Sequence, residues 1–284
     1  MSEYQYYEFR TIDHCLTDEE MDELRSFSTR AEITPNCFIN DYSWGSFKGD
    51  EDRWMDEYFD AFLYYANWGT HSLKLRIPSK LLDIETAKAY CDGEYTSARI
   101  SNDKIILDFN SGNEEIDEWD EDFQLGPFLS LRNDLIHGDL RCLYLAWLSE
   151  KQSDIYEEFY DENEIEPPVP PGLAQLSPAL IYFANFLRIN SNLIEAASEN
   201  SASLDDFVFN INDYRLWIRT FKEDEKINLL IEILDGSLKG DHTASIKLSH
   251  RFKQAQLSHQ TSIPRRTITQ LLKKAEVRTD TLPG

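Results

Sequence analysis

The stretch PFLSLRNDLIHGDLRCLYLAWLS, residues 127–149, decides the fold. Its apolar residues recur at helical spacing, which predicts buried helix rather than strand. Gly138 can leave the right-handed helical region without Cβ strain and so end a first helix. Asp139 can accept backbone N–H bonds and begin a second helix. We therefore expect two apolar helices that meet at a sharp joint over 137–139 and anchor the core. The apolar positions are Leu131, Leu135, Leu140, Leu143, Tyr144, Trp147 and Leu148.

Acidic runs flank this stretch on both sides, EEIDEWDED at 114–122 and DIYEEFYDENEIE at 154–166. The chain has a net charge of −24, and residues 113–166 hold 17 Asp and Glu against 3 Lys and Arg. Residues 239–284 reverse this balance, with 9 bases against 3 acids. Because nucleic-acid affinity comes largely from neutralising phosphates, such an acidic body should repel a polyanion. A purely solubilising role for the acidic charge is the competing interpretation.

Length and composition indicate a soluble protein of one large or two smaller domains, since the chain has 284 residues. Its four cysteines, Cys15, Cys37, Cys91 and Cys142, are scattered and form no C-x-x-C pair. This pattern is typical of reduced thiols in a cytosolic protein. The N-terminus MSEYQYYEFR lacks the pattern of a signal peptide, and no apolar run reaches the ~18 residues of a membrane span. We therefore expect a cytoplasmic protein without a membrane segment.

Strand and helix patterns alternate over residues 1–112. Strands are expected at 4–12, 31–44 with a break at Pro35, 71–78, 95–100 and 104–109. Helices are expected after a capping box at Thr17–Glu20, over 51–67 and over 79–91. This order predicts the α+β class: an N-terminal sandwich-like domain, with the ferredoxin-like arrangement as one candidate, followed by a mostly helical domain.

The predicted domain division has four parts. Residues 1–112 form the α+β domain, and 113–126 form an acidic connector. Residues 127–254 form the helical domain, with an acidic and proline-rich insert at 152–172. Residues 255–284 form a linker and a basic C-terminal helix.

The nearest approach to a catalytic cluster is Asn133, Asp134, His137 and Asp139. A histidine between carboxylates can serve as a general base or a metal ligand. A helix–turn–helix joint requires the same residues, and we favour that structural interpretation. The sequence predicts no metal site and no cofactor, because nucleotide-binding and metal-ligand spacings are missing from it.

Aromatic residues are the other candidates for recognition: Trp44, Trp54, Trp68, Tyr64 and Tyr65. Exposed aromatics beside carboxylates can bind proteins, and core packing is the competing interpretation. The loop WGSFKGDED, 44–52, is expected to present Phe47 to solvent.

The acidic runs at 114–122 and 154–166 could mimic nucleic-acid phosphates and occupy a basic groove of another protein, and a solvated linker is the alternative. The predicted partner-binding residues are Glu114, Glu115, Asp117, Glu118, Trp119, Asp120, Glu121, Asp122 and Phe47.

Four stretches resemble, in order, a family of uncharacterised bacterial proteins: TDEEMDELRSFSTRAEITP (17–35), NWGT (67–70), GDLRCLYLAWL (138–148) and EPPVPPGL (166–173). The resemblance is best over residues 1–175. It implies a bacterial, cytoplasmic origin and no activity, so no functional residue follows from it.

The sequence thus predicts a non-enzymatic accessory or regulatory subunit that binds a partner protein, with a basic or nucleic-acid-handling protein as a candidate partner. One alternative is a hydrolase-like or metal-dependent enzyme centred on His137. Another is nucleic-acid binding through the basic tail, residues 247–278.

Overall fold

The computed structural model describes residues 3–45, 47–112, 123–156, 161–204, 210–234, 248–249, 251–253, 255 and 265–279. The strands are β1 (Gln5–Arg10), β2 (Glu32–Thr34), β3 (Cys37–Tyr42), β4 (Ala61–Ala66), β5 (His71–Pro78), β6 (Thr96–Ser101) and β7 (Lys104–Ser111). The helices are α1 (Asp18–Phe27), α2 (Glu51–Glu57), α3 (Ile84–Lys88), α4 (Leu125–Ile136), α5 (Arg141–Tyr156), α6 (Pro178–Phe186), α7 (Ser191–Ser198), α8 (Ile211–Arg219), α9 (Glu223–Leu234) and α11 (Ile268–Thr279).

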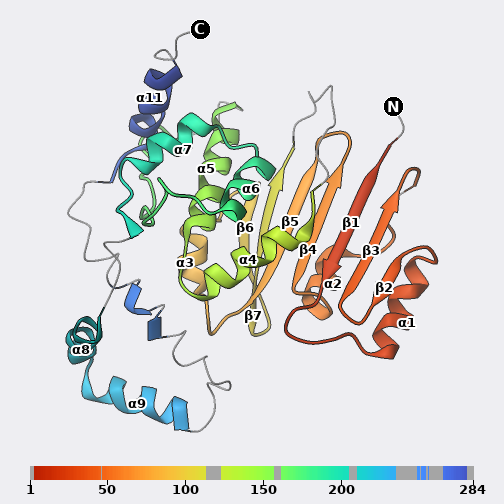
Figure 1. Ribbon diagram of the computed structural model, residues 1–284, viewed down its shortest axis with the longest axis horizontal. Coiled ribbons are helices and arrows are strands. Elements are labelled where there is room, and N and C mark those ends of the chain that lie inside the picture. Colours follow the sequence, from red (N-terminus) through yellow and green to blue (C-terminus); the bar gives the residue numbers. More distant parts are fainter. Residues whose placement is uncertain are drawn as a thin grey trace.

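In the described part of the chain, seven strands form one sheet in the order β2-β3-β1-β4-β5-β7-β6. Every pairing in it is antiparallel. The predicted α+β class is confirmed, because this sheet is followed by a run of helices (Figure 1). The sheet is larger than that of the βαββαβ ferredoxin-like motif considered from the sequence.

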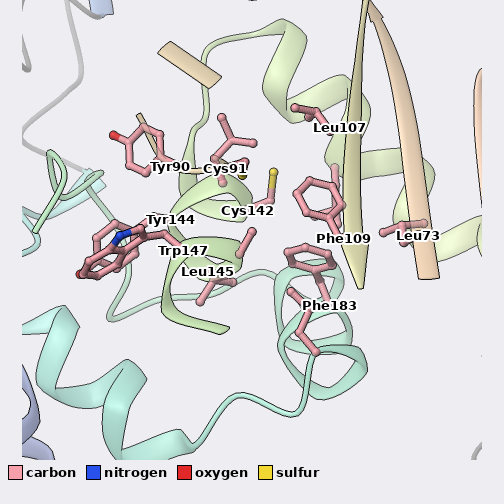
Figure 2. Packing of buried hydrophobic residues seen from close by; sticks show 14 of the residues in the cluster. Leu73, Tyr90, Cys91, Leu107, Phe109, Cys142, Tyr144, Leu145, Trp147 and Phe183 are labelled. Atoms are coloured by element: carbon pink, nitrogen blue, oxygen red, sulfur yellow. The ribbon is translucent and has the colours of Figure 1, made fainter. Parts of the chain in front are cut away.

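Helices cover the sheet on both faces. On one face, α4, α5 and α6 pack over the central strands, and Phe109 of β7 meets Phe183 of α6 with ring centroids 5.1 Å apart. Figure 2 shows this contact with Cys142 and Leu145 of α5 beside it. On the other face, α1 and α2 pack over β1, β3 and β4, around the buried Trp54. The central strands β4 and β5 are therefore buried on both sides.

The helix predicted over 51–67 is wrong beyond Glu57, where α2 ends. Residues 61–66, AFLYYA, form the central strand β4 instead. Successive side chains of a strand point to opposite faces, so Phe62 packs under α2 while Leu63 packs under α4. A strand that is apolar on both faces carries no alternation, and periodicity alone does not distinguish it from a buried helix.

A buried charge network joins the two layers at Arg76 of β5. Its guanidinium donates to the Asp60 carboxylate at 3.0 Å and to the carbonyls of Met55 and Asp56 at 3.0 Å. Arg132 of α4 donates to the Arg76 carbonyl at 2.7 Å and to the Asp13 carboxylate at 2.6 Å. Side chains from both faces of the sheet thus meet around one strand.

Asp60 stays ionised inside this network. Burial alone would raise its pKa, but backbone N–H groups of Asp13 and Ile12 and the charge of Arg76 outweigh burial and hold the pKa below its usual value. The ion pair with Arg76 is therefore a fully charged contact in the core.

The joint predicted within 127–149 is confirmed. Helix α4 ends at Ile136, and Gly138 follows with φ of +81°. His137 donates its backbone N–H to the Asn133 carbonyl at 3.1 Å, which completes the last turn of α4. The Asp139 carboxylate accepts the Arg141 N–H at 3.0 Å at the start of α5.

The C-terminal helix α11 docks on α7 instead of standing apart from the protein. Arg266 forms a two-point ion pair with the buried Glu166, with N–O distances of 2.9 and 2.7 Å. Tyr144 of α5 also donates its hydroxyl to Glu166, and Ile268 and Leu271 enter the main core.

The main core also includes residues from both sides of the predicted boundary near residue 112, for example Phe109 and Phe128. The four-part domain division stays a prediction, and its first boundary runs through a shared core. None of the helices described has the length and hydropathy that a membrane crossing requires.

Replacing Gly138 by alanine should lower the free energy of unfolding by about 1–2 kcal/mol, because a Cβ resists the left-handed conformation at this joint. Gly126, whose Cβ would meet nothing within 4 Å, is the control. Gly126→Ala should be neutral or slightly stabilising, as expected at a helical site. Urea unfolding of both variants provides the measurement, and equal effects would contradict the role of Gly138.

Arg266→Ala should lower the free energy of unfolding by about 3–5 kcal/mol, because Glu166 would stay buried without its cation. The matched control is Lys274→Ala, which breaks a half-exposed pair between α11 and Glu199 and should cost below about 1 kcal/mol. Chemical denaturation measures both. A loss at Arg266 no larger than at Lys274 would show that α11 is not held by this pair.

Candidate functional site

One end of the sheet carries two of the aromatic residues that the sequence indicated for recognition, Trp44 and Trp68. Gln5 of β1 pairs with Tyr42 of β3 on one side and with Ala66 of β4 on the other. His71 of β5 pairs with Ser111 of β7 at the same level. We call this end the rim and define it as residues 3–4, 43–45, 67–70 and 111–112. It lies at the end of the sheet nearest the N-terminus (Figure 1).

Two tryptophans of the rim are exposed. Trp44 follows β3 and is 73% exposed, and Trp68 lies in the turn between β4 and β5 and is 41% exposed. Because β3 and β4 flank β1, the ends of these two strands lie about 10 Å apart. The aromatic candidates therefore divide, since Trp54 and Tyr65 are core residues while Trp44 and Trp68 face solvent.

Hydrogen bonds hold the turns that carry these tryptophans. Gln5 donates its side-chain amide to the Gly45 carbonyl at 3.0 Å. The Tyr4 N–H donates to the Asn67 side chain at 2.9 Å, and the Asn67 N–H donates back to the Tyr4 carbonyl at 3.0 Å. Both tryptophans precede a glycine with positive φ, Gly45 at +99° and Gly69 at +89°. The exposed rings are thus carried on fixed backbone.

The predicted acidic run, Glu114 to Asp122, lies outside the described residues. The residues on either side of it are described, and they both lie near His71. Ser111 pairs with His71 in the sheet, and the buried Phe123 ring has its centroid 4.9 Å from that of His71. The chain therefore leaves the rim after Gly112 and returns to it at Phe123.

His71 and Arg188 connect the rim to the helical layer. The buried His71 ring bonds through Nδ1 to the Phe186 carbonyl at 3.0 Å, and its Nε2 lies 3.0 Å from Nη2 of Arg188. A carbonyl accepts and a guanidinium donates, so the ring is neutral with its hydrogen on Nδ1. Arg188 also donates to the Gly69 carbonyl at 2.9 Å and to the Ser111 hydroxyl at 3.3 Å.

Phe47 is partly buried, which corrects the expectation that it faces solvent. Its ring stacks on Tyr7 with centroids 4.7 Å apart and meets Trp54 edge-on at 5.0 Å. The two glycines of the loop suggested an exposed ring. The ring instead packs against the aromatic cluster that contains Trp54 of α2. Its assignment as a partner-binding residue stays a prediction.

The predicted catalytic candidates lie at the α4–α5 joint, but they do not converge on a common point. His137 is exposed, and its Nδ1 lies 2.7 Å from the Asn133 carbonyl of its own helix. Both carboxylate oxygens of Asp139 bind Arg141, at 2.6 and 3.0 Å. Burial raises the pKa of Asp134, and Asp139 adds to this effect. His137 and Asp139 are thus engaged within the joint itself.

A second charged cluster lies on the α2 face of the sheet, around Lys74. Its ammonium contacts Asp108 at 2.7 Å and Asp52 at 3.0 Å. Burial alone would lower the pKa of Lys74, but the two carboxylates raise it above its usual value. A lysine held as a cation is neither a nucleophile nor a base. Among the described residues, no three His, Cys, Asp or Glu side chains come together as a metal site.

Comparison with family models, with curated proteins and with solved structures gives no match for this chain.

Sequence reasoning missed His71 and Arg188. His71 opens an alternating strand pattern, and Arg188 follows the C-cap of the largely apolar helix α6 with a positive φ of +54°. The one available signal was a lone charged residue just after a largely apolar helix. Its partners lie more than 70 positions away in the chain, so spacing did not reveal them.

His71 should make stability depend on pH. Burial lowers its pKa from 6.5 to about 4, and the nearby charge of Arg188 adds to this effect. As the pH falls, His71 takes up a proton in the unfolded chain before it does so in the folded protein. The contribution of neutral His71 to the free energy of unfolding is therefore complete above pH 6.5 and is lost as the pH falls toward 4. The full loss is about 3 kcal/mol. Urea unfolding between pH 7 and 5 measures the slope, which should flatten in His71→Gln. His137→Ala, at an exposed histidine, is the control and should keep the slope. An unchanged slope in His71→Gln would contradict the assignment.

Proposed function

We propose that the protein is a non-enzymatic accessory subunit that binds a partner protein through the rim. The observation that carries the proposal is the pair of exposed tryptophans, Trp44 and Trp68, on turns fixed by hydrogen bonds at one end of the sheet. Tryptophan is enriched among residues that dominate binding energy, and a preformed turn lowers the entropic cost of binding.

The charge around the rim supports a basic partner. The run between Gly112 and Phe123 holds seven carboxylates and no base. Exposed Glu3 and Asp41 add to it from the neighbouring strands. Such a field steers a positively charged surface toward the rim and speeds association. Apolar anchors among acidic groups suit a basic or nucleic-acid-handling protein.

The two alternatives have less support. In the enzyme alternative, His137 and Asp139 would have to share a substrate, but each binds groups of its own joint. In the tail alternative, the bases of residues 247–278 would have to meet phosphates. Arg266 is buried against Glu166 and Lys274 pairs with Glu199, so these two charges are already neutralised.

The test begins with a tagged pull-down from the native host and continues with surface-plasmon kinetics on each captured protein. The double variant Trp44→Ala/Trp68→Ala should weaken binding about 10-fold or more, mainly by faster dissociation. Replacing the seven acids of 114–122 by Asn or Gln should slow association about 10-fold at low salt and much less at high salt.

The control is Ile100→Ala, because Ile100 is an exposed apolar residue on β6 that pairs with Ile105 toward the opposite end of the sheet. This variant should bind as the wild type does. If a captured protein binds the tryptophan variant and the acidic variant with the same kinetics as the wild type, the rim is not the binding surface.

A further inference from the structure

Helices α8 and α9 lie away from the sheet, at the lower left in Figure 1. One side of α8 is held by aromatic packing. Tyr214 and Trp217 contact the fully buried Phe252 with ring centroids 4.6 and 5.2 Å apart, and Trp217 also packs edge-on against Phe221 at 4.6 Å. This packing gives α8 a small aromatic core with Phe221 and Phe252.

Several apolar side chains of the pair face solvent. Ile227, Leu230, Ile231 and Leu234 are 47%, 59%, 51% and 84% exposed, and we call them the α9 stripe. Their spacing of i, i+3, i+4 and i+7 places them on one side of the helix over two turns. Ile211, Leu216 and Ile218 of α8 are exposed as well. An amphipathic helix whose apolar side faces water marks an interaction surface.

Charge indicates what covers the stripe. The chain has a net charge of −24, so two copies repel each other on the whole. Residues 210–234 contribute little to this repulsion, with five acids against four bases and a net charge of −1. In the first turn of α9, Glu223 pairs with Lys226 at 3.6 Å and Glu225 pairs with Arg251 at 2.5 Å. A second copy can therefore approach here with little repulsion.

We infer that the α9 stripe is a self-association surface, on which α9 of a second copy packs antiparallel. The stripe is self-complementary in this orientation, since Ile227 of one copy opposes Leu234 of the other and Leu230 and Ile231 lie near the two-fold axis. A closed isologous dimer is the commonest symmetric assembly of soluble proteins. It buries the apolar side of α9 without bringing the acidic parts of the two copies together.

Dimerisation through α9 does not depend on the function of the rim. The rim lies at the far end of the sheet, so both copies would keep it free (Figure 1). A dimer would then offer two partner-binding ends, which raises the effective affinity for a partner with repeated sites.

Sedimentation equilibrium of the full chain between about 1 and 100 μM tests the inference, in the range expected of a small interface. The mass should rise from that of the 33.2 kDa chain toward twice that value. The variant Leu230→Gln/Ile231→Gln should weaken association at least about 10-fold. Asn228→Ala, at an exposed polar residue of the same helix, should associate as the wild type does. Circular dichroism should show equal helix content in all three.

Added salt gives a second readout. Screening of the repulsion between two chains of −24 should tighten the dimer as salt rises. A wild type that stays monomeric at the highest concentration would overturn the inference. A dimer whose association constant is unchanged in Leu230→Gln/Ile231→Gln would also overturn it. A dimer that becomes weaker as salt rises would do the same.

Discussion

The structure depends on the burial of β5 on both faces although it carries Lys74 and Arg76. A cation taken out of water costs several kcal/mol unless it is paired and its donors are satisfied. Asp60 and the Met55 and Asp56 carbonyls meet this requirement for Arg76, and Asp52 and Asp108 meet it for Lys74. These partners come from α2, from Asp60 just before β4, and from β7. The two charges thereby fix where α2 ends and how three elements lie against the strand.

The same constraint explains how much of the fold could be predicted. Local signals succeeded where they have a local cause: the capping box at Thr17–Glu20 forms, and Gly138 takes the positive φ that its joint requires. The expected helix through residue 67 failed because β4 is apolar on both faces, and that pattern has no period of two. Which face a residue meets depends on distant elements, and only the assembled sheet specifies it.

Candidate site residues divide in the same way. Trp44, Trp54 and Trp68 look alike in sequence, yet Trp54 is buried while the other two are exposed. Trp54 lies within α2, on the side of the helix that faces the sheet. Trp44 and Trp68 instead lie just after the ends of strands β3 and β4. A residue just beyond a strand end has no sheet above or below it. The turns at 43–45 and 67–70 could have located the strand ends in the sequence. That both ends lie side by side follows only from the strand register, in which Gln5 pairs with both Tyr42 and Ala66.

Exposed tryptophans carry a cost, because apolar groups that face water favour non-specific association. Glu3 and Asp41 are exposed carboxylates at the same end of the sheet, and the sequence between Gly112 and Phe123 adds seven acids. Charges beside an apolar segment suppress association with like molecules, since every copy bears the same sign. They leave association with a basic surface open. In the proposed function, the acidic charge and the exposed rings act together, because the charge repels copies of the chain and attracts a partner of opposite charge. The α9 stripe, where acids and bases nearly balance, lacks that protection.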